Sequence, residues 1–339
     1  MDLNHKNILV SCCYGLGDLI TCTPALRQLK QTYPACHLTV LTNDNHIGAI
    51  RGIPYIDEVV GLGRGTRWGR FSLLPVLRRQ QGVAFLDWQP QLLLLAWLLR
   101  IPLRGGICRE GSGLNRLFTY RAANRQQTFR EYAGSRRARE ISESLGISLA
   151  GDMTCCDIAA ADAAVRQGVD QLLEASGLRP EQPFLLLSPF AGYRAKYWPE
   201  KEAKRFVQLA EQALGMPVLV TGGPGDKPAA NRIAARNVAG QLDVPMLVEI
   251  VRRAALVVSA DSGPMHLAGA AGRPVVALFG TDLPLRWAPR QHCEVITLQL
   301  ECCPCDGAQM DSCPDFACMA GITADMVLER CLRLVHKQL

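Results

Sequence analysis

Aromatic residues are scarce in this chain, making up 6% of its 339 residues. Proteins that bind single-stranded nucleic acid stack bases on aromatic side chains, and we find no nucleic-acid-binding motif, so this partner class is disfavoured. Internal repeats and low-complexity tracts are also missing, which argues against solenoids and disordered arrays. With 48% hydrophobic and 20% charged residues, the sequence predicts a globular protein long enough for two domains.

A hydrophobic run of membrane-spanning length is missing too. The most apolar stretch, Leu92–Leu99, has eight residues and lies between Gln91 and Arg100, whereas a span needs about 20. This stretch predicts a buried helix face, with a membrane-surface contact as the alternative. The first residues have neither a basic segment nor a long apolar one, so we expect no signal peptide and a cytoplasmic location.

Lysine is absent between residues 61 and 140, where 15 arginines and four acidic residues occur. The planar guanidinium donates two parallel hydrogen bonds, which suits phosphate groups. One interpretation is a well-solvated helical surface. The other is a surface for an anionic glycan or glycolipid acceptor, which would place the protein peripherally at the inner face of the inner membrane.

Cysteine, by contrast, is abundant, with 14 residues. Without an export signal we expect reduced thiols. The spacing Cys302-x2-Cys305-x7-Cys313-x4-Cys318 is plausible for zinc or iron ligands. A structural metal and a group of reduced structural thiols both remain open for this cluster.

Apolar strand-like runs alternate with helical patterns in both halves of the chain, which favours parallel α/β sheets. The alternation pauses over 150–182, where we place a domain boundary. We expect an N-terminal domain over 1–165, a C-terminal domain over 166–322 and a last helical segment over 323–339, with a cleft between the domains. The expected strands are 7–12, 36–42, 56–60, 83–87, 184–188, 217–221, 256–259 and 274–279, and the expected helices are 24–32, 90–100, 129–145, 162–175, 199–214, 226–238, 264–271 and 323–337.

Ligands of such sheets bind outside the carboxyl ends of the strands, so the loops there are candidate sites. The first contains Gly15, Gly17 and Asp18. It is not a dinucleotide-binding fingerprint, because the third glycine is replaced by Ile20. A tight glycine turn would aim Asp18 into the cleft; the alternative is that Asp18 only caps the next helix.

Two loops of the second half carry similar signals. After the strand ending at Ser188, small residues let backbone N–H groups approach an anion, and Arg194 and Lys196 add positive charge. After the next strand, Gly222 and Gly223 allow close backbone approach, and Asp226 can accept hydrogen bonds from ribose hydroxyls. Each signal alone is also that of an ordinary turn.

The fourth loop, in VVSADSGPMHLAGAAG (257–272), places Asp261, Ser262 and Gly263 at the start of a helix. A helix N-terminus carries partial positive charge and unpaired N–H donors, so it suits a diphosphate. Helix capping explains Asp261 or Ser262 but not His266. That histidine is either a packed residue or a ligand contact.

Together these segments resemble glycosyltransferase family 9, the ADP-heptose:lipopolysaccharide heptosyltransferases. The similar stretches are ILVSCCYGLGDLITCTPALRQLKQTYP, LLLSPFAGYRAKYWPEKEAKRFVQLA, LVTGGPGDK and SADSGPMHLAGAAGRPVVALFGTDLPLRWAP. The resemblance implies a GT-B fold, which is two Rossmann-like α/β domains facing across a cleft, with the final helix able to pack back on the first domain.

The resemblance also implies roles for individual residues. Asp18 matches the general base and Lys196 the basic residue beside the phosphates, while Asp226 matches a ribose-binding acid. The sugar-nucleotide loop is matched by the residues Asp261, Ser262, Gly263 and His266.

The implied reaction is an inverting transfer of a heptose or a related sugar from a nucleoside-diphosphate sugar, expected to be ADP-heptose, that requires no metal cofactor and resists chelators. The stretch Cys12-Cys13-Tyr14 and the lack of a histidine in 129–140 depart from the family pattern. Both departures lie on the acceptor side and leave the acceptor open. Alternative functions are a GT-B-like epimerase and a non-catalytic nucleotide-binding assembly protein.

Overall fold

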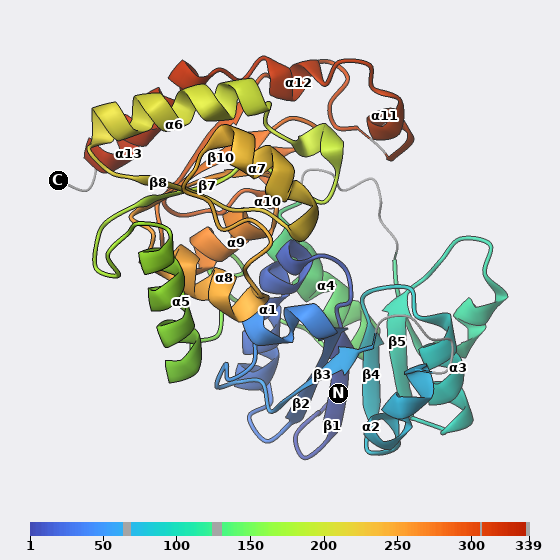
Figure 1. Ribbon diagram of the computed structural model, residues 1–339. Helices are drawn as coiled ribbons and strands as arrows, with labels where there is room; N and C mark the ends of the chain where they lie inside the picture. The colour runs from blue at the N-terminus through green and yellow to red at the C-terminus, as the bar shows by residue number, and fades with distance from the viewer. Residues whose placement is uncertain (64–68, 124–130, 306, 337–339) are drawn as a thin grey trace. The chain divides into compact units, whose positions relative to one another are not determined.

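The computed structural model describes residues 1–63, 69–123, 131–305 and 307–336. The chain divides into two compact units, Met1–Ala159 (unit 1) and Ala160–Leu339 (unit 2). Each unit is built on its own parallel sheet with helices packed on it (Figure 1). In the described residues, none of the helices is both long enough and apolar enough to cross a membrane.

The sheet of unit 1 has six parallel strands in the order β3-β2-β1-β4-β5-β6. This is the order of the dinucleotide-binding Rossmann fold, whose ligands bind where the strand order reverses. Here the reversal lies between β1 and β4, which flank each other at Val10 and Ala84. The strands are β1 (Asn7–Ser11), β2 (His37–Asn43), β3 (Glu58–Leu62), β4 (Gly82–Phe85), β5 (Leu103–Ile107) and β6 (Tyr120–Ala122).

Two helices of unit 1 pack against each other, and the second of them also covers β4, β5 and β6. Gly105 lets this helix approach β5 closely, because a Cβ atom there would lie 1.6 Å from the carbonyl oxygen of Ser144. Two shorter helices bury apolar side chains, including Leu77 and Leu92, in a cluster with Phe85. The helices are α1 (Leu16–Thr32), α2 (Leu74–Arg78), α3 (Pro90–Leu98) and α4 (Ala133–Leu145).

Helix α1 begins at Leu16, eight residues before the start that we expected at Pro24. Proline favours the first turn of a helix, but here it lies inside α1. Since Pro24 has no N–H, the carbonyl of Ile20 loses its normal partner; the hydroxyl of Thr23 donates to that oxygen instead, at 2.7 Å. As a result Gly17 belongs to the first turn of the helix rather than to a loop.

The sheet of unit 2 has five parallel strands in the order β11-β10-β9-β7-β8. Counted from the other edge, this is the flavodoxin-like order 2-1-3-4-5, with its reversal between β7 and β9. Ser188 and Ser259 are register neighbours at that point. The strands are β7 (Leu185–Ser188), β8 (Val218–Val220), β9 (Leu256–Ala260), β10 (Val275–Phe279) and β11 (Cys293–Thr297).

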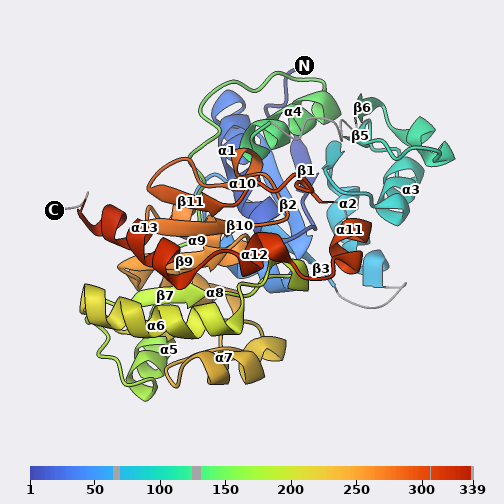
Figure 2. The ribbon, with the colours of Figure 1, turned by 90° about the horizontal axis from the view of Figure 1, so that it is seen from above.

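Helices α6 and α13 lie side by side on one face of this sheet (Figures 1 and 2). The resemblance allowed the last helix to pack on the first domain; in the structure α13 buries Val327 and Cys331 in the core of unit 2. Helices α8 and α9 pack against each other, and α5 packs on α8. The bounds are α5 (Ala163–Ala175), α6 (Glu200–Leu214), α7 (Lys227–Ile233), α8 (Val244–Arg253), α9 (Gly263–Ala270), α10 (Pro284–Trp287), α11 (Gly307–Ser312), α12 (Ala317–Ala320) and α13 (Ala324–His336).

Other elements differ from expectation. The helix expected over 226–238 ends at Ile233. The chain then becomes extended, and Val238 donates its N–H to the carbonyl of Val220, the last residue of β8. Helix α8 and strands β5, β6 and β11 were not predicted. Residues 129 and 130 of one predicted helix and Lys337 of another lie outside the described residues.

Candidate active site

Asp18 lies at the carboxyl edge of the unit 1 sheet, in the first turn of α1. One carboxylate oxygen accepts the N–H of Gly15 at 3.3 Å, so the capping role expected as the alternative is present. The other oxygen accepts from the guanidinium of Arg137 at 2.5 Å. The side chain keeps 25% of its surface exposed, which leaves it accessible to a substrate.

Arg137 comes from α4 and its side chain is only 2% exposed. Its second guanidinium nitrogen donates to Glu140, also buried, at 2.8 Å. Burial alone would lower the pKa of Arg137, but the charges of Asp18, Glu140 and nearby cysteines raise it above its ordinary value. The arginine therefore stays charged and holds two carboxylates at once.

A second buried carboxylate, Asp87, follows β4 at the same edge. It accepts hydrogen bonds from Ser11 at 2.5 Å and from Gln89. Tyr14 lies near this carboxylate. Partial burial raises the pKa of the Tyr14 hydroxyl, and the charge of Asp87 raises it further. Negatively charged groups therefore gather at this edge of the sheet, where Arg137 is already paired with Asp18 and Glu140.

In unit 2, Lys196 meets two carboxylates at the carboxyl edge of the sheet. Its ammonium lies 2.5 Å from Asp261 and 3.8 Å from Asp282. Burial raises the pKa of Asp282, with Lys196 opposing the shift and Asp261 adding to it. The indole N–H of Trp287 also donates to Asp282, at 2.9 Å.

Helix α9 begins at Gly263, directly after Ser262, so this predicted loop does lead into a helix N-terminus. Ser262 occupies the N-cap position, but its side chain makes no capping hydrogen bond; its hydroxyl donates to the carbonyl of Ala260 at 3.2 Å. His266 lies one turn into α9, is 7% exposed and packs edge-on against Trp287. Its ring therefore lies beside Trp287, whose indole N–H contacts the Asp282 carboxylate.

Asp226 is held in place by two hydrogen bonds from residues of unit 2. It accepts from the N–H of Gly223 at 2.8 Å and from the hydroxyl of Tyr197 at 2.7 Å. Burial and this second hydrogen bond raise the pKa of Tyr197 to about 12. Gly222 is required beside them, because a Cβ atom there would lie 2.7 Å from the ring of Phe190.

A cavity of about 520 Å³ opens next to Asp226, within unit 2. This volume is in the range of small-molecule sites. Its walls combine aromatic, apolar and charged side chains, and do not include Lys196 or Asp261. The lining residues include Phe190, Tyr197, Asp226, Phe316 and Met319.

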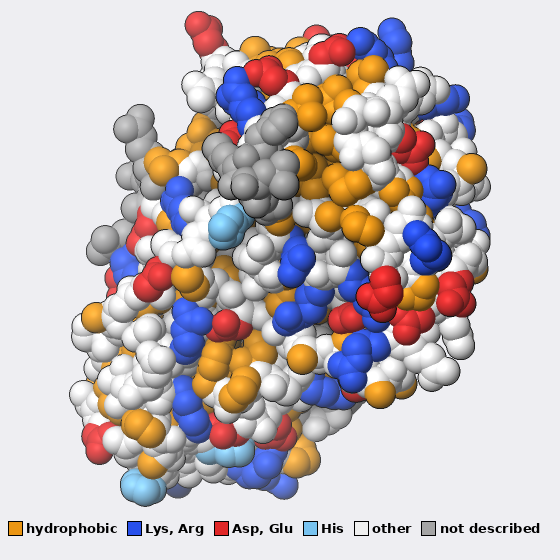
Figure 3. Space-filling model, turned by 90° about the vertical axis from the view of Figure 1, so that its left-hand side faces the viewer, with side chains coloured by type: hydrophobic (Ala, Val, Ile, Leu, Met, Phe, Trp, Pro, Cys, Tyr) orange, Lys and Arg blue, Asp and Glu red, His pale blue; other side chains and the backbone are white. Residues whose placement is uncertain are grey.

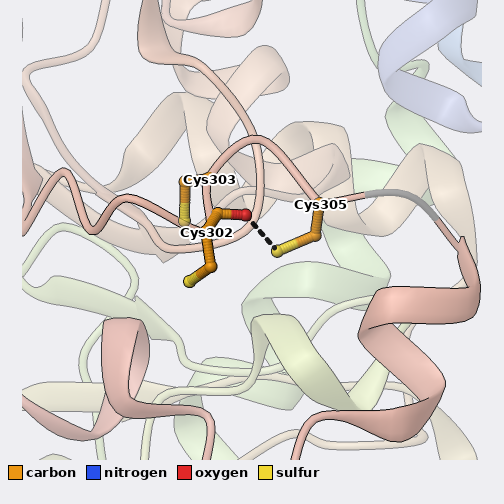
Figure 4. Close-up of side chains that lie close together, drawn as sticks. All are labelled: Cys302, Cys303 and Cys305. Carbon is orange, nitrogen blue, oxygen red and sulfur yellow. Dashed lines mark hydrogen bonds between the residues drawn. The ribbon is translucent and has the colours of Figure 1, made fainter.

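Three cysteines after β11 lie close together in the described residues, and two of them, Cys302 and Cys305, belong to the predicted set. The sulfur atoms of Cys302, Cys303 and Cys305 are all within 4.8 Å of one another. Figure 4 shows the sulfur of Cys305 directed at the carbonyl oxygen of Cys302, to which it donates at 3.4 Å. Cys303 is a member of this group that the spacing argument had left out.

The described arginines of the segment 61–140 include some that bond within unit 1 and others that are exposed. Arg104, Arg136, Arg137 and Arg139 are turned to carbonyl or carboxylate groups of unit 1. Figure 3 draws the side of the protein at the left of Figure 1, where Lys and Arg side chains from the whole chain stand among acidic and apolar ones. The exposed arginines among the described residues are Arg78, Arg79, Arg100, Arg109, Arg116 and Arg121, whereas Arg64, Arg67, Arg125 and Arg130 lie outside those residues.

Sequence reasoning missed Asp87, Arg137, Glu140, Asp282 and Trp287. Asp87 follows an apolar strand, as Asp261 does, and that position could have flagged it. Asp282 had the same signal after β10. Arg137 and Glu140 had none, because they come from a helix far along the chain, and their spacing is that of any solvated helix face.

Comparison with known proteins gives a family match over most of the chain. The model of glycosyltransferase family 9 (heptosyltransferase) matches residues 71–312. The lipopolysaccharide core heptosyltransferase OpsX of Haemophilus influenzae is 24% identical over 305 residues, which cover 84% of this chain and 82% of that protein.

Solved structures share the fold. A family 9 glycosyltransferase from Veillonella parvula has a TM-score of 0.81 at 23% identity, with 99% of both chains covered. The ADP-heptose lipopolysaccharide heptosyltransferase II of E. coli has a TM-score of 0.77 at 21% identity, covering 98% of this chain and 99% of that one. The predicted fold class, two Rossmann-like α/β domains of the GT-B type, is confirmed.

Proposed function

Since this chain belongs to glycosyltransferase family 9, the heptosyltransferases, we propose that it transfers a heptose from ADP-heptose to a lipopolysaccharide-core-like glycolipid, with inversion at the anomeric carbon. The observation that carries the proposal is the family match together with Lys196 and Asp261 beside the N-terminus of α9. The alternatives, an epimerase or a non-catalytic assembly protein, have no such support.

Unit 2 holds the donor in this proposal. The diphosphate lies at the start of α9, where Ser262 and Gly263 present backbone N–H groups and the helix contributes partial positive charge. Lys196 balances the charge that develops on the departing diphosphate. These groups supply the stabilisation without a metal, so added Mg²⁺ or Mn²⁺ is not required.

The ribose and base lie toward Asp226, beside the cavity. Phe190 and Met319 offer apolar surface for a base, and the carboxylate that holds Tyr197 faces the same space. Asp226 already accepts two hydrogen bonds, yet a carboxylate has about four acceptor positions. It can therefore accept from ribose hydroxyls while it keeps both.

Unit 1 supplies the base and contacts the acceptor. The acceptor hydroxyl loses its proton to Asp18 as its oxygen bonds to the anomeric carbon, and the bond from that carbon to the diphosphate breaks. Arg137 and Gly15 fix the orientation of the carboxylate. A positioned base of this kind contributes roughly 10²–10⁴-fold to the rate.

A lipid-linked acceptor would bring the protein to a membrane surface, and α3 has a suitable face. Leu94, Trp97 and Leu98 are exposed there, at 42%, 46% and 59%, and Arg100 follows them, also exposed. Apolar side chains next to an arginine are typical of interfacial helices on anionic lipid. We propose peripheral contact through α3 at the inner face of the inner membrane.

The test is a transfer assay with ADP-heptose and heptose-free lipopolysaccharide core, comparing the wild type with Asp18→Asn. The variant should lose at least about 10²-fold in kcat and keep its ADP affinity, measured by calorimetry. Asp57→Asn, in the same unit but at the Lys30 ion pair, is the matched control and should turn over normally. Normal turnover by Asp18→Asn would overturn the assignment of the base, and transfer from UDP-sugars alone would overturn the donor.

A further inference from the structure

The carboxylate of Asp282 lies at the carboxyl edge of unit 2, next to the lysine that we place on the diphosphate. The ammonium of Lys196 contacts Asp261 at 2.5 Å and lies 3.8 Å from Asp282. One ammonium therefore pairs closely with only one of the two carboxylates. Asp282 cannot itself bind the diphosphate, because two negatively charged groups repel each other.

Asp282 is held in a fixed direction by its own loop. One carboxylate oxygen accepts the backbone N–H of Leu283 and the other accepts the indole N–H of Trp287, both at 2.9 Å. A carboxylate has about four acceptor positions, so these two hydrogen bonds leave about half of them. The side chain also keeps 23% of its surface exposed. Asp282 is therefore oriented in advance and can still accept hydrogen bonds from a ligand.

Trp287 gives this carboxylate a large apolar neighbour. Its side chain is only partly buried. The ring packs against His266 with the ring centres 6.0 Å apart, and the guanidinium of Arg286 lies 4.9 Å from the ring centre. These contacts fix the ring, and the ring N–H in turn fixes Asp282. An aromatic surface next to a fixed polar group suits a ligand that offers both C–H and O–H groups, as a sugar does.

The position of Asp282 also favours the sugar over the other parts of the donor. In the proposed function Lys196 binds the diphosphate, and the ribose and base lie toward Asp226. The described residues that line the cavity beside Asp226 do not include Asp282 or Trp287. The transferred sugar is attached to the end of the diphosphate away from the ribose, and its hydroxyl groups are donors that a carboxylate accepts.

We propose that Asp282 binds hydroxyl groups of the donor sugar and so discriminates between sugars, and that Trp287 is its positioning residue. This inference rests on the proposed function. Asp282 touches the substrate but takes no proton from it, and no bond to carbon changes there. A donor that lacks a hydroxyl at this place leaves the carboxylate without its partner, which weakens binding roughly 10–10²-fold.

The test compares the binding of ADP with that of ADP-heptose, by calorimetry on the full-length protein without an acceptor. The ratio of the two dissociation constants isolates the contribution of the sugar. In Asp282→Ala the affinity for ADP-heptose should fall roughly 10–10²-fold. The affinity for ADP should stay within about twofold or rise, because the substitution removes a negative charge near the diphosphate.

Two further variants control this comparison. Trp287→Phe keeps an aromatic ring and loses the N–H that fixes Asp282, so the affinity for ADP-heptose should fall about threefold to tenfold while that for ADP stays unchanged. Asp325→Ala removes a carboxylate of unit 2 that pairs with Arg205 at the surface, and both affinities should equal those of the wild type. If Asp282→Ala does not fold, Asp282→Asn takes its place, since it keeps the shape of the side chain and removes the charge.

Equal losses for ADP and ADP-heptose in Asp282→Ala would overturn the inference, because Asp282 would then act on the diphosphate through Lys196. Unchanged affinity for ADP-heptose would overturn it as well. Discrimination is measured by the ratio of kcat/KM for ADP-heptose to that for ADP-glucose, which should narrow in Asp282→Ala. An unchanged ratio would refute the role in choosing the sugar.

The binding measurements need no transfer, so they separate this inference from the proposed function. A wild type that transfers heptose, while Asp282→Ala keeps its affinity for ADP-heptose, would refute the inference alone. A wild type that binds ADP-heptose through Asp282 but transfers no heptose would refute the function alone.

Discussion

The carboxyl edges of the two sheets both bring a cation against carboxylates, but they bury it to different degrees. In unit 1, Arg137 is 2% exposed and spans Asp18 and Glu140, with Asp87 at the same edge. In unit 2, Lys196 is 16% exposed and lies next to a helix N-terminus. The first edge has surplus negative charge and a fixed carboxylate, which suits proton removal. The second keeps its lysine more exposed and adds the partial positive charge of a helix N-terminus, which suits a diphosphate.

This difference predicts that Arg137 acts on the fold and on the orientation of Asp18, whereas Lys196 acts on the reaction. Arg137→Met should cost unit 1 about 3–5 kcal/mol of unfolding free energy, because it removes the buried guanidinium that pairs with both Asp18 and Glu140. Urea unfolding of the variant measures this. The same substitution at Arg79, whose ion pair with Glu58 is exposed, should cost about 0–1 kcal/mol. Equal losses in the two variants would show that the buried Arg137 ion pairs stabilise unit 1 no more than an exposed one.

Lys196→Met should lower kcat/KM by about 10²–10³-fold, through loss of charge stabilisation on the departing diphosphate. The substitution also strands the buried Asp261, so the informative comparison is the double variant Lys196→Met/Asp261→Asn. Its thermal unfolding should return toward that of the wild type while transfer activity stays low. Recovery of activity with stability would show that Lys196 acts only on the fold.

The smallest effect concerns the membrane. Trp97→Ser should lower partition onto anionic vesicles roughly tenfold, since burying one large apolar side chain contributes about 1.5–3 kcal/mol. Cosedimentation with phosphatidylglycerol vesicles measures it. Leu285→Ser, an equally exposed apolar position of unit 2, is the control and should leave partition unchanged. Equal partition of Trp97→Ser and the wild type would exclude α3 as the contact.

Much of the fold followed from local patterns. Short apolar runs ended by glycine or polar residues located eight strands, because strands buried on both faces are apolar at nearly every position. The glycine-containing strand β5 was not predicted. Its Gly105 and Gly106 allow close packing against α4 and Phe118, but glycine does not favour a strand. The predicted helix was shorter than α1, because proline was expected only in its first turn. That local rule does not anticipate that Thr23 donates to the carbonyl of Ile20, which Pro24 leaves without a partner.

The sequence by itself determined the family, the two α/β units and the loops at which polar residues follow apolar strands, because these depend on short stretches of neighbouring residues. It also pointed to the cysteine cluster through spacing alone. Only the tertiary structure decided that Arg137 and Glu140 join Asp18, that Asp282 joins Lys196, and that Gly280 brings Cys303 and Cys318 together. The reason is physical: contacts between distant segments depend on strand order and helix packing, which local residue patterns do not encode.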